Sequence, residues 1–413
     1  MRRGLLPLLL AVAVFLPYGA FAATPPPTPV PPHGSPSPFL TSLDIPHVMP
    51  GRAPARGAKA VILLDMGSGQ VLYSSRPNRQ LPVASLTKVM TALLTIERSK
   101  PGEMVTVSEE AAPPPDLVGV SALGLQAGER ISVENLLYAL LLQSAGDAAA
   151  ALAEHVSGSI SSFVRAMNTR AVELGASNTH FLSPSGLDDR GYSTARDIAI
   201  IATAAFEGRL FTRIVGTKFK ELPGPPDGPD RYIQNRDVLL WLYPDSIGGK
   251  TGFTSKAGFC LMAVAGRGDR RSMAVLLGEP DEPFSDAAGL LTWSFDAFER
   301  STVIEVGESF GRRQIGGSVV DVAAGQDLTL LVPRGEAPSR RAVVSESSSL
   351  GLRPGDPVGA VVVSAGGSKL GQVPLVVARV VQGEEEPPAF WWGRAVSSLF
   401  QARSTALDGT LGG

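Results

Sequence analysis

The sequence predicts an α/β (α+β) domain with an antiparallel sheet flanked by helices, followed by a small all-β domain and a C-terminal amphipathic helix. Strand-like segments stand before and after a long helical stretch, which implies that the first strands of the sheet pair with its last strands. After residue 300 the sequence changes to short β-branched runs separated by Gly and Pro, as in a small β-sandwich. The chain of 413 residues, 44% of them hydrophobic and 18% charged, can bury a large core.

The first residues have the features of an export signal. Arg2 and Arg3 precede an apolar run, and residues 20–22 (Ala-Phe-Ala) form a small-x-small cleavage site. The apolar run is shorter than the ~20 residues that span a bilayer, so a signal peptide over residues 1–22 is favoured over a transmembrane anchor.

A linker is predicted over residues 23–54. Eight prolines lie between residues 24 and 38, and such a stretch forms a stiff, extended tether and no packed core. Cys260 is the only cysteine, so an internal disulfide is excluded, and its place in an apolar run favours a buried residue over a nucleophile.

Composition and motifs exclude several classes of function. A formal net charge of -2 gives no electrostatic reason to expect nucleic acid as a partner. The four histidines stand alone without the spacing of metal ligands, and no G-x-S-x-G motif or complete phosphate-binding loop is present. We therefore expect no metal and no cofactor.

Residues 55–299 are predicted to form the α/β domain. A hairpin over residues 58–65 and 70–73 leads into a helix near Ser85. The segments expected after that helix are, in order, helices over residues 133–142, 148–156 and, with breaks, 163–206, strand-like and loop stretches over 209–245, strands near 250, over 259–265 and over 272–277, and a helix through 290–295.

The stretch around Ser85 contains the first chemical motif. Apolar side chains follow the helical period at Leu86, Val89, Met90 and Leu93. Ser85 and Lys88 are three residues apart and would share one helix face, with the amine within reach of the hydroxyl. An amine whose pKa is lowered by desolvation can act as a base towards serine, but an isolated S-x-x-K arises about once by chance in a chain of this length.

A second motif strengthens the first. Lys250, Thr251 and Gly252 form a K-T-G sequence at the head of an apolar run that predicts a strand, and S-x-x-K with K-T-G is typical of class A β-lactamases and penicillin-binding proteins. Ser144 lies in a small-residue break between two predicted helices. It could present its hydroxyl in a cleft or simply cap a helix.

Residues 300–383 are predicted to form the all-β domain. Its β-branched runs lie at residues 303–306, 318–322, 328–332, 342–344, 358–363 and 375–380. An acidic, proline-containing break opens the last segment, 384–413, in which Trp392, Val396 and Leu399 share one helical face. We interpret this helix as interfacial, on a membrane surface; a helix docked on the chain's own β-domain is the alternative.

The motifs together suggest a family. With the S-x-x-K and K-T-G sequences, residues 178–181 (Asn-Thr-His-Phe) and residues 191–197 (Gly-Tyr-Ser-Thr-Ala-Arg-Asp), the chain closely resembles the exported D-alanyl-D-alanine carboxypeptidases, which are low-molecular-mass penicillin-binding proteins with a transpeptidase/β-lactamase-like fold. The resemblance runs from about Ala58 to the C-terminus. It implies an enzyme on the periplasmic side of the bacterial inner membrane, held there by the C-terminal helix, that trims the terminal D-alanine from the peptidoglycan stem pentapeptide and is inhibited by β-lactams.

The resemblance also implies a role for each motif residue. Ser85 would be the acylated nucleophile, Lys88 its base and Ser144 a proton relay. The terminal carboxylate of the substrate would bind at Lys250, Thr251 and Gly252, with Arg236 beside them. The backbone N–H groups of Ser85 and Phe253 would form the oxyanion hole.

Two positions depart from the family pattern. Gly146 stands where the S-x-N motif has its asparagine, and Pro283 stands where an arginine often precedes an aromatic residue, here Phe284. Both changes remove polar substrate contacts and leave the nucleophile, the base and the relay serine in place. A catalytically weakened peptidoglycan- or penicillin-binding protein and a DD-endopeptidase therefore stay open as alternatives. A β-lactamase is disfavoured because no E-x-x-L-N-type segment is evident.

Overall fold

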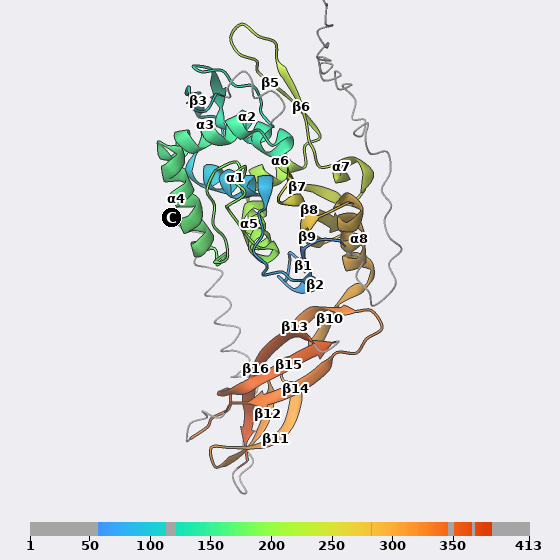
Figure 1. The fold of residues 1–413 in the computed structure, drawn as a ribbon. Coiled ribbons are helices and arrows are strands. Elements are labelled where there is room, and N and C mark those ends of the chain that lie inside the picture. Colours follow the sequence, from blue (N-terminus) through green and yellow to red (C-terminus); the bar gives the residue numbers. More distant parts are fainter. Residues whose placement is uncertain (1–56, 113–120, 282, 346–350, 366–367, 382–413) are drawn as a thin grey trace, which may run out of the picture.

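The sheet of the α/β domain joins the two ends of its sequence. The computed structural model describes residues 57–112, 121–281, 283–345, 351–365 and 368–381. The sheet is antiparallel, and its strand order is β2 (Val71–Ser75), β1 (Ala60–Asp65), β9 (Arg270–Glu279), β8 (Gly258–Arg267) and β7 (Ser246–Thr254). The pairing of β1 with β9 confirms that the first strands lie beside the last (Figure 1).

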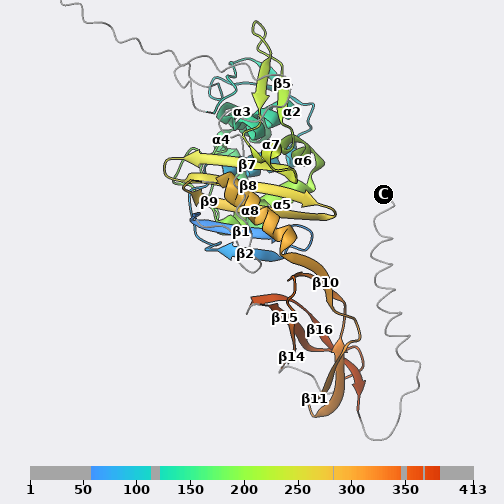
Figure 2. The same ribbon diagram turned by 90° about the vertical axis from the view of Figure 1, so that its right-hand side faces the viewer.

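Helices cover both faces of this sheet because its strands are apolar on both sides. Along β1, Ile62 and Leu64 belong to one buried cluster, whereas Val61 and Leu63 belong to the other, as the two-residue period of a strand requires. The first cluster packs against α1 (Thr87–Arg98) and α5 (Ala195–Glu207), and the second against α8 (Pro283–Asp296). Figure 2 shows α8 crossing the near face of the sheet.

The middle part of the sequence forms a layer of helices. It consists of α2 (Val133–Tyr138), α3 (Gly146–Ser157) and α4 (Ile160–Glu173), with a short hairpin of β3 (Met104–Thr106) and β4 (Arg130–Ser132) beside it. The Ser132 hydroxyl caps α2 by accepting a hydrogen bond of 3.2 Å from the Asn135 amide. The predicted single helix over residues 133–142 is wrong in detail. It changes after Tyr138 to a π-helical turn, Ala139–Gln143, which directly precedes Ser144.

Residues 209–245 contain helices that the sequence-based prediction missed. α6 (Arg209–Val215) precedes the hairpin of β5 (Phe219–Leu222) and β6 (Arg231–Gln234), and α7 (Leu239–Leu242) follows it. In α6 the buried residues are Phe211, Ile214 and Val215. This is helical spacing, but a stretch of seven residues is too short to separate a helix from a strand by period alone.

The second domain is all-β, as predicted. β10 (Phe298–Ile304) pairs with β13 (Leu328–Pro333). A five-stranded sheet has the order β11 (Ser309–Ile315), β12 (Ser318–Ala324), β16 (Ser368–Val380), β15 (Pro357–Ala365) and β14 (Ser339–Val344). The prediction missed β11, because this strand at the sheet edge is mostly exposed and contains Arg312 and Arg313 in place of apolar residues.

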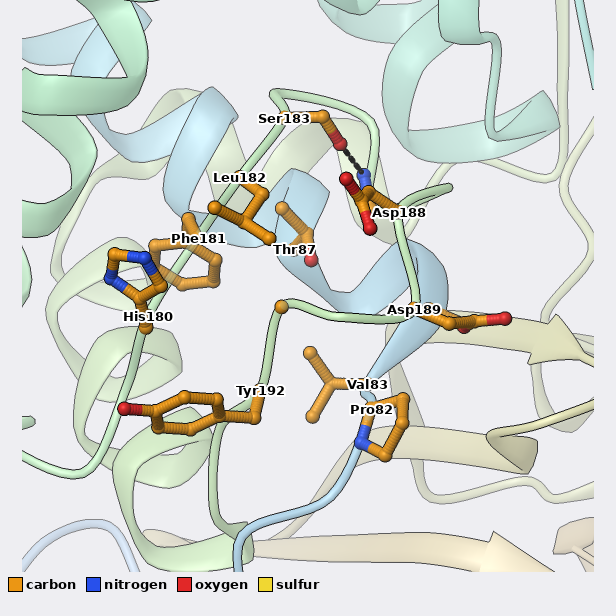
Figure 3. A pocket seen from close by; sticks show the side chains of 13 residues that line it. Pro82, Val83, Thr87, His180, Phe181, Leu182, Ser183, Asp188, Asp189 and Tyr192 are labelled. Carbon is orange, nitrogen blue, oxygen red and sulfur yellow. Dashed lines mark hydrogen bonds between the residues drawn. The ribbon is translucent and has the colours of Figure 1, made fainter.

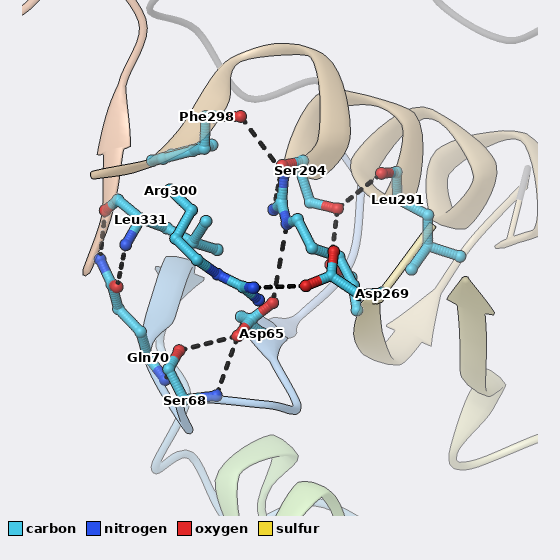
Figure 4. A network of polar contacts seen from close by, with 11 residues as sticks. Asp65, Ser68, Gln70, Asp269, Leu291, Ser294, Phe298, Arg300 and Leu331 are labelled. Atoms are coloured by element: carbon cyan, nitrogen blue, oxygen red, sulfur yellow. Dashed lines mark hydrogen bonds and ion pairs between the residues drawn. The ribbon is translucent and has the colours of Figure 1, made fainter. Parts of the chain in front are cut away.

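Hydrogen bonds connect the two domains (Figure 4). The Gln70 side chain, in the turn after β1, donates to the Leu331 carbonyl at 2.7 Å and accepts from the Leu331 amide at 3.0 Å. Arg270 donates to the carbonyls of Ser294 and Phe298 at 2.7 and 3.2 Å, and Arg300 forms an ion pair with Asp269. These contacts hold β10 and β13 against the edge of the α/β domain.

Several sequence predictions lie outside the described residues. These are the signal peptide over 1–22, the linker over 23–54 and the amphipathic helix within 384–413. Within the part of the chain that the structure describes, no helix is both long and apolar enough to cross a membrane. The exact domain boundaries, 55–299 and 300–383, stay predictions.

Candidate active site

Ser85 lies in a single 3₁₀ turn, Ala84–Leu86, that leads directly into α1. The turn is held in an unusual backbone conformation, since Ala84 has a φ of +47°. Gly186 packs against it so closely that a Cβ added there would lie 2.0 Å from the Ala84 carbonyl oxygen. Behind the turn, a cavity of about 10 Å³ separates Val83 and Thr87 from the loop around Tyr192 (Figure 3). This volume holds one water at most, so the Ser85 turn is closely packed against the loop behind it.

Lys88 follows one helical turn later and points at the same site. Its Nζ lies 3.0 Å from the Ser85 Oγ and donates a 2.6 Å hydrogen bond to the Ser185 carbonyl. Only 1% of its surface is exposed. Burial, followed by the positive charge of Arg236, lowers the pKa of Lys88 from its ordinary value of 10.5 to about 7. Much of this amine is therefore neutral at neutral pH and able to accept the proton of Ser85.

Ser144, after the π-helical turn, and Lys250, on β7, contact each other in the same site. The Lys250 Nζ donates to the Ser144 Oγ at 3.1 Å and to the Thr251 carbonyl at 2.7 Å. Ser144 directly follows the π-helical turn, and its φ of +64° ends the helical path of the backbone there. Burial, followed by the charges of Lys88 and Arg236, lowers the pKa of Lys250 well below its usual range, and the buried carboxyl of Asp237 acts in the opposite direction.

These groups surround one pocket of about 330 Å³, a volume in the range of small-molecule sites. Its lining includes the predicted residues Ser85, Ser144, Arg236, Thr251, Gly252 and Phe253. The side chains of Lys88 and Lys250 are buried behind this surface. Gly252 allows β7 to approach the serine closely, since a Cβ there would lie 3.0 Å from the Ser85 amide nitrogen. The structure thus brings all the predicted site residues together.

Other residues organise the site without belonging to a recognised motif. Arg236 donates to the Ser121 hydroxyl at 2.5 Å, and the Ser121 carbonyl accepts from the Gly146 amide at 2.7 Å. The buried carboxylate of Asp147 accepts hydrogen bonds from the amides of residues 123, 124 and 125, at distances from 2.9 to 3.1 Å. Asp147 directly follows the Ser144 motif, so its position offered a signal. Ser121 offered none, because only the fold brings it to the pocket.

The two departures from the family pattern can now be placed. A Cβ added at Gly146 would lie 3.6 Å from the Ser121 carbonyl oxygen and 4.0 Å from both Ser185 and Leu187, which are ordinary contact distances. Gly146 therefore leaves room for a side chain beside Ser185, the residue whose carbonyl binds Lys88. Pro283 and Phe284 line the pocket, so the second departure also faces the site.

The fold and the paired serine–lysine site together define a serine peptidase of the S-x-x-K class. Residues 48–281 match the family Peptidase S11, D-alanyl-D-alanine carboxypeptidase, and residues 298–382 match the penicillin-binding protein 5 C-terminal domain. The chain therefore belongs to the D-alanyl-D-alanine carboxypeptidase family of serine peptidases.

The chain is similar to individual members of this family over most of their length. The chain is 34% identical to D-alanyl-D-alanine carboxypeptidase DacC of Escherichia coli (strain K12) over 351 residues, which are 80% of this chain and 86% of that protein. It is 31% identical to DacF of Bacillus subtilis (strain 168) over 339 residues, covering 78% and 85%. The crystal structure of penicillin binding protein 5 from Haemophilus influenzae superposes with a TM-score of 0.64 at 29% identity, covering 80% of this chain and all (100%) of that one.

Proposed function

We propose that this peptidase removes the terminal D-alanine from peptidoglycan stem pentapeptides through an acyl-enzyme on Ser85, and that penicillins acylate the same serine. One observation supports this most directly. The Ser85 hydroxyl lies 3.0 Å from the buried amine of Lys88, whose pKa is lowered to about 7. A serine paired with such an amine is an activated nucleophile without any histidine or metal.

Substrate binding uses the opposite end of the pocket. Arg236 and Thr251 line the pocket, and Lys250 lies buried behind Thr251. Two cationic side chains and a hydroxyl in one corner bind the C-terminal carboxylate of a peptide. The carboxylate in turn favours the protonated form of Lys250, whose pKa burial holds low in the free enzyme. This places the last peptide bond of the substrate over Ser85.

Acylation follows from the same geometry. Neutral Lys88 takes the proton as the Ser85 Oγ attacks the carbonyl carbon of the scissile bond. The negative charge on the carbonyl oxygen is stabilised by the backbone N–H groups of Ser85 and Phe253. The proton then passes to the nitrogen of the departing D-alanine, with Ser144, hydrogen-bonded to Lys250, as the relay. A water molecule hydrolyses the ester and restores Ser85 by the reverse proton path.

The release of D-alanine tests this function. The protein without residues 1–22 is incubated with a D-Ala-D-Ala-terminated pentapeptide, and free D-alanine is quantified, with Ser85→Ala as the inactive control. Steady release by the wild type alone is expected. Covalent labelling by penicillin without any release would instead favour the catalytically weakened binding protein, the alternative that Gly146 motivates. Cleavage of a crosslinked dimer of stem peptides into its two separate peptides, without release of D-alanine from the pentapeptide, would favour the endopeptidase.

We also propose that the enzyme works on the periplasmic side of the inner membrane. The basic and apolar pattern of residues 1–22 supports export, and the apolar face of Trp392, Val396 and Leu399 supports attachment to the membrane surface. Truncation before Phe390 should release an active, soluble protein from the membrane fraction. A truncated, signal-cleaved form that still sediments with membranes would place the anchor elsewhere.

A further inference from the structure

A buried carboxyl group lies behind the carboxylate end of the Ser85 pocket. Asp237 directly follows Arg236, which lines the pocket, but Asp237 itself is only 1% exposed. Its Oδ1 accepts a 3.1 Å hydrogen bond from the Leu239 amide, and its Oδ2 has no hydrogen-bond partner among the residues that the structure describes. A carboxyl group buried in this way is costly to ionise unless a positive charge lies close by. Acylation of Ser85 does not use this group.

Contacts on both sides hold Asp237 near Lys250. The Arg236 amide donates to the Leu142 carbonyl at 3.1 Å, in the π-helical turn. The Asn235 side chain donates at 2.9 and 3.0 Å to two carbonyls at and just after the C-terminal end of α6. Both α6 and α7 pack against β7, the strand that contains Lys250. Asp237 therefore lies where it interacts electrostatically with Lys250, which is also 1% exposed.

The charges around Lys250 show what Asp237 contributes. Burial lowers the pKa of Lys250 most, and the positive charges of Lys88 and Arg236 lower it further, whereas Asp237 raises it. Burial raises the pKa of Asp237 to about 7, and Lys250 acts in the opposite direction. When a ligand carboxylate binds, two cations, Arg236 and Lys250, face two anions, the ligand and Asp237. Without Asp237 the site would carry an excess positive charge, which disfavours the protonated form of Lys250.

We propose that Asp237 is a positioning residue that keeps Lys250 protonated when the ligand carboxylate is bound. As the carboxylate enters, Asp237 loses one proton and Lys250 gains one, so the pair as a whole exchanges none with the solvent. The inference rests on the proposed function of the Ser85 pocket. It adds that recognition of the ligand carboxylate depends on a buried charge that belongs to none of the sequence motifs, and that it extends to higher pH than Lys250 alone would allow.

Asp237→Asn removes the charge with little change in shape. The asparagine Oδ1 can still accept from the Leu239 amide, and the new NH2 group replaces the oxygen that has no partner among the described residues. Benzylpenicillin and its methyl ester provide the test, because they differ only at the carboxyl group. The second-order rate constant of Ser85 acylation is measured by intact mass for both compounds between pH 6 and 8.

The wild type should prefer the free acid, and Asp237→Asn should reduce that preference by about tenfold at pH 7, since a change of one unit in the pKa of Lys250 changes the ratio of its two protonation states tenfold. In the variant the preference should also begin to fall at a lower pH than in the wild type, because Lys250 then loses its proton at a lower pH. In D-alanine release, the variant should raise KM by a similar factor and leave kcat near that of the wild type.

The ratio of the two acylation rates is the decisive quantity, because any loss of folded protein affects both compounds equally. Asp65→Asn is the matched control and should keep the wild-type ratio, since Asp65 is also 1% exposed but lies on β1 and is absent from the pocket lining. An unchanged ratio in Asp237→Asn, equal slowing with both compounds, or a wild type without any preference would overturn the role of Asp237. Failure of the wild type to be acylated by either compound would instead overturn the proposed function, and this inference with it.

Discussion

Replacing Gly146 with asparagine restores the side chain at the point where this chain departs from its family. The structure predicts that the new side chain fits. The nearest atoms to an added Cβ are the Ser121 carbonyl oxygen at 3.6 Å and atoms of Ser185 and Leu187 at 4.0 Å. Gly146 is also the first residue of α3 and has no positive φ, so backbone strain does not oppose the change. The amide would begin beside Ser185, whose carbonyl already binds Lys88.

The expected gain is one hydrogen bond to Lys88 or to the substrate backbone in the transition state. Such a bond contributes about 1.4 kcal/mol, which corresponds to roughly a tenfold increase in kcat/KM. The assay measures D-alanine release from a D-Ala-D-Ala peptide and, separately, the rate of penicillin acylation. Gly146→Ala is the matched control, because it adds the Cβ without the amide and should leave both rates near those of the wild type.

A particular pair of results would refute this reasoning. If Gly146→Asn lowers both rates while Gly146→Ala leaves them unchanged, the amide itself disturbs Lys88. The site would then be adapted to glycine, and other groups would orient the substrate. If both variants lower the rates equally, the space around Gly146 is smaller in solution than the contact distances indicate.

Three further predictions follow from individual contacts. Because Lys88 must be neutral to accept a proton and its pKa is about 7, acylation should slow as the pH falls below 7 and level off above it; a rate that does not change between pH 5 and 8 would exclude Lys88 as the base. Gly252→Ala should lower kcat by about 100-fold, since its Cβ would lie 3.0 Å from the Ser85 amide nitrogen and displace an oxyanion donor; kinetics close to wild type would contradict the assigned oxyanion hole. Gly186→Ala should lower the free energy of unfolding by roughly 2–4 kcal/mol in a denaturant titration, because its φ is +77° and its Cβ would overlap the Ala84 carbonyl; unchanged stability would show that this loop can move away.

Patterns in the sequence predicted the parts of the fold that depend on local periodicity. The β1–β2 hairpin, the helix after Ser85, the K-T-G strand and the all-β second domain all have clear apolar patterns, and the structure confirms them. The missed elements have weak patterns. α6 is only seven residues long, and β11 is a polar strand at a sheet edge.

The residues of the active site also fall into those that sequence patterns could predict and those that they could not. Ser85 and Lys88 could be paired from their spacing, because one helical turn places them on the same face. Ser144 and Lys250 are 106 residues apart, so spacing could not bring them together; the family resemblance assigned both to one site, and the structure adds the hydrogen bond between them. Ser121 and the Ser185 carbonyl have no motif at all, since a backbone oxygen or a loop hydroxyl gains its role only from the tertiary fold.

Covalent modification of Ser85 is the most direct measurement of the central claim. The signal-cleaved protein is incubated with benzylpenicillin, and intact mass spectrometry followed by peptide mapping locates the adduct. One adduct per chain on Ser85 is expected, together with its complete loss in Ser85→Ala and a strong decrease in Lys88→Ala, since the hydroxyl then lacks its base. An adduct that persists in Ser85→Ala, or that maps to another residue, would contradict the assignment of Ser85 as the nucleophile of this peptidase.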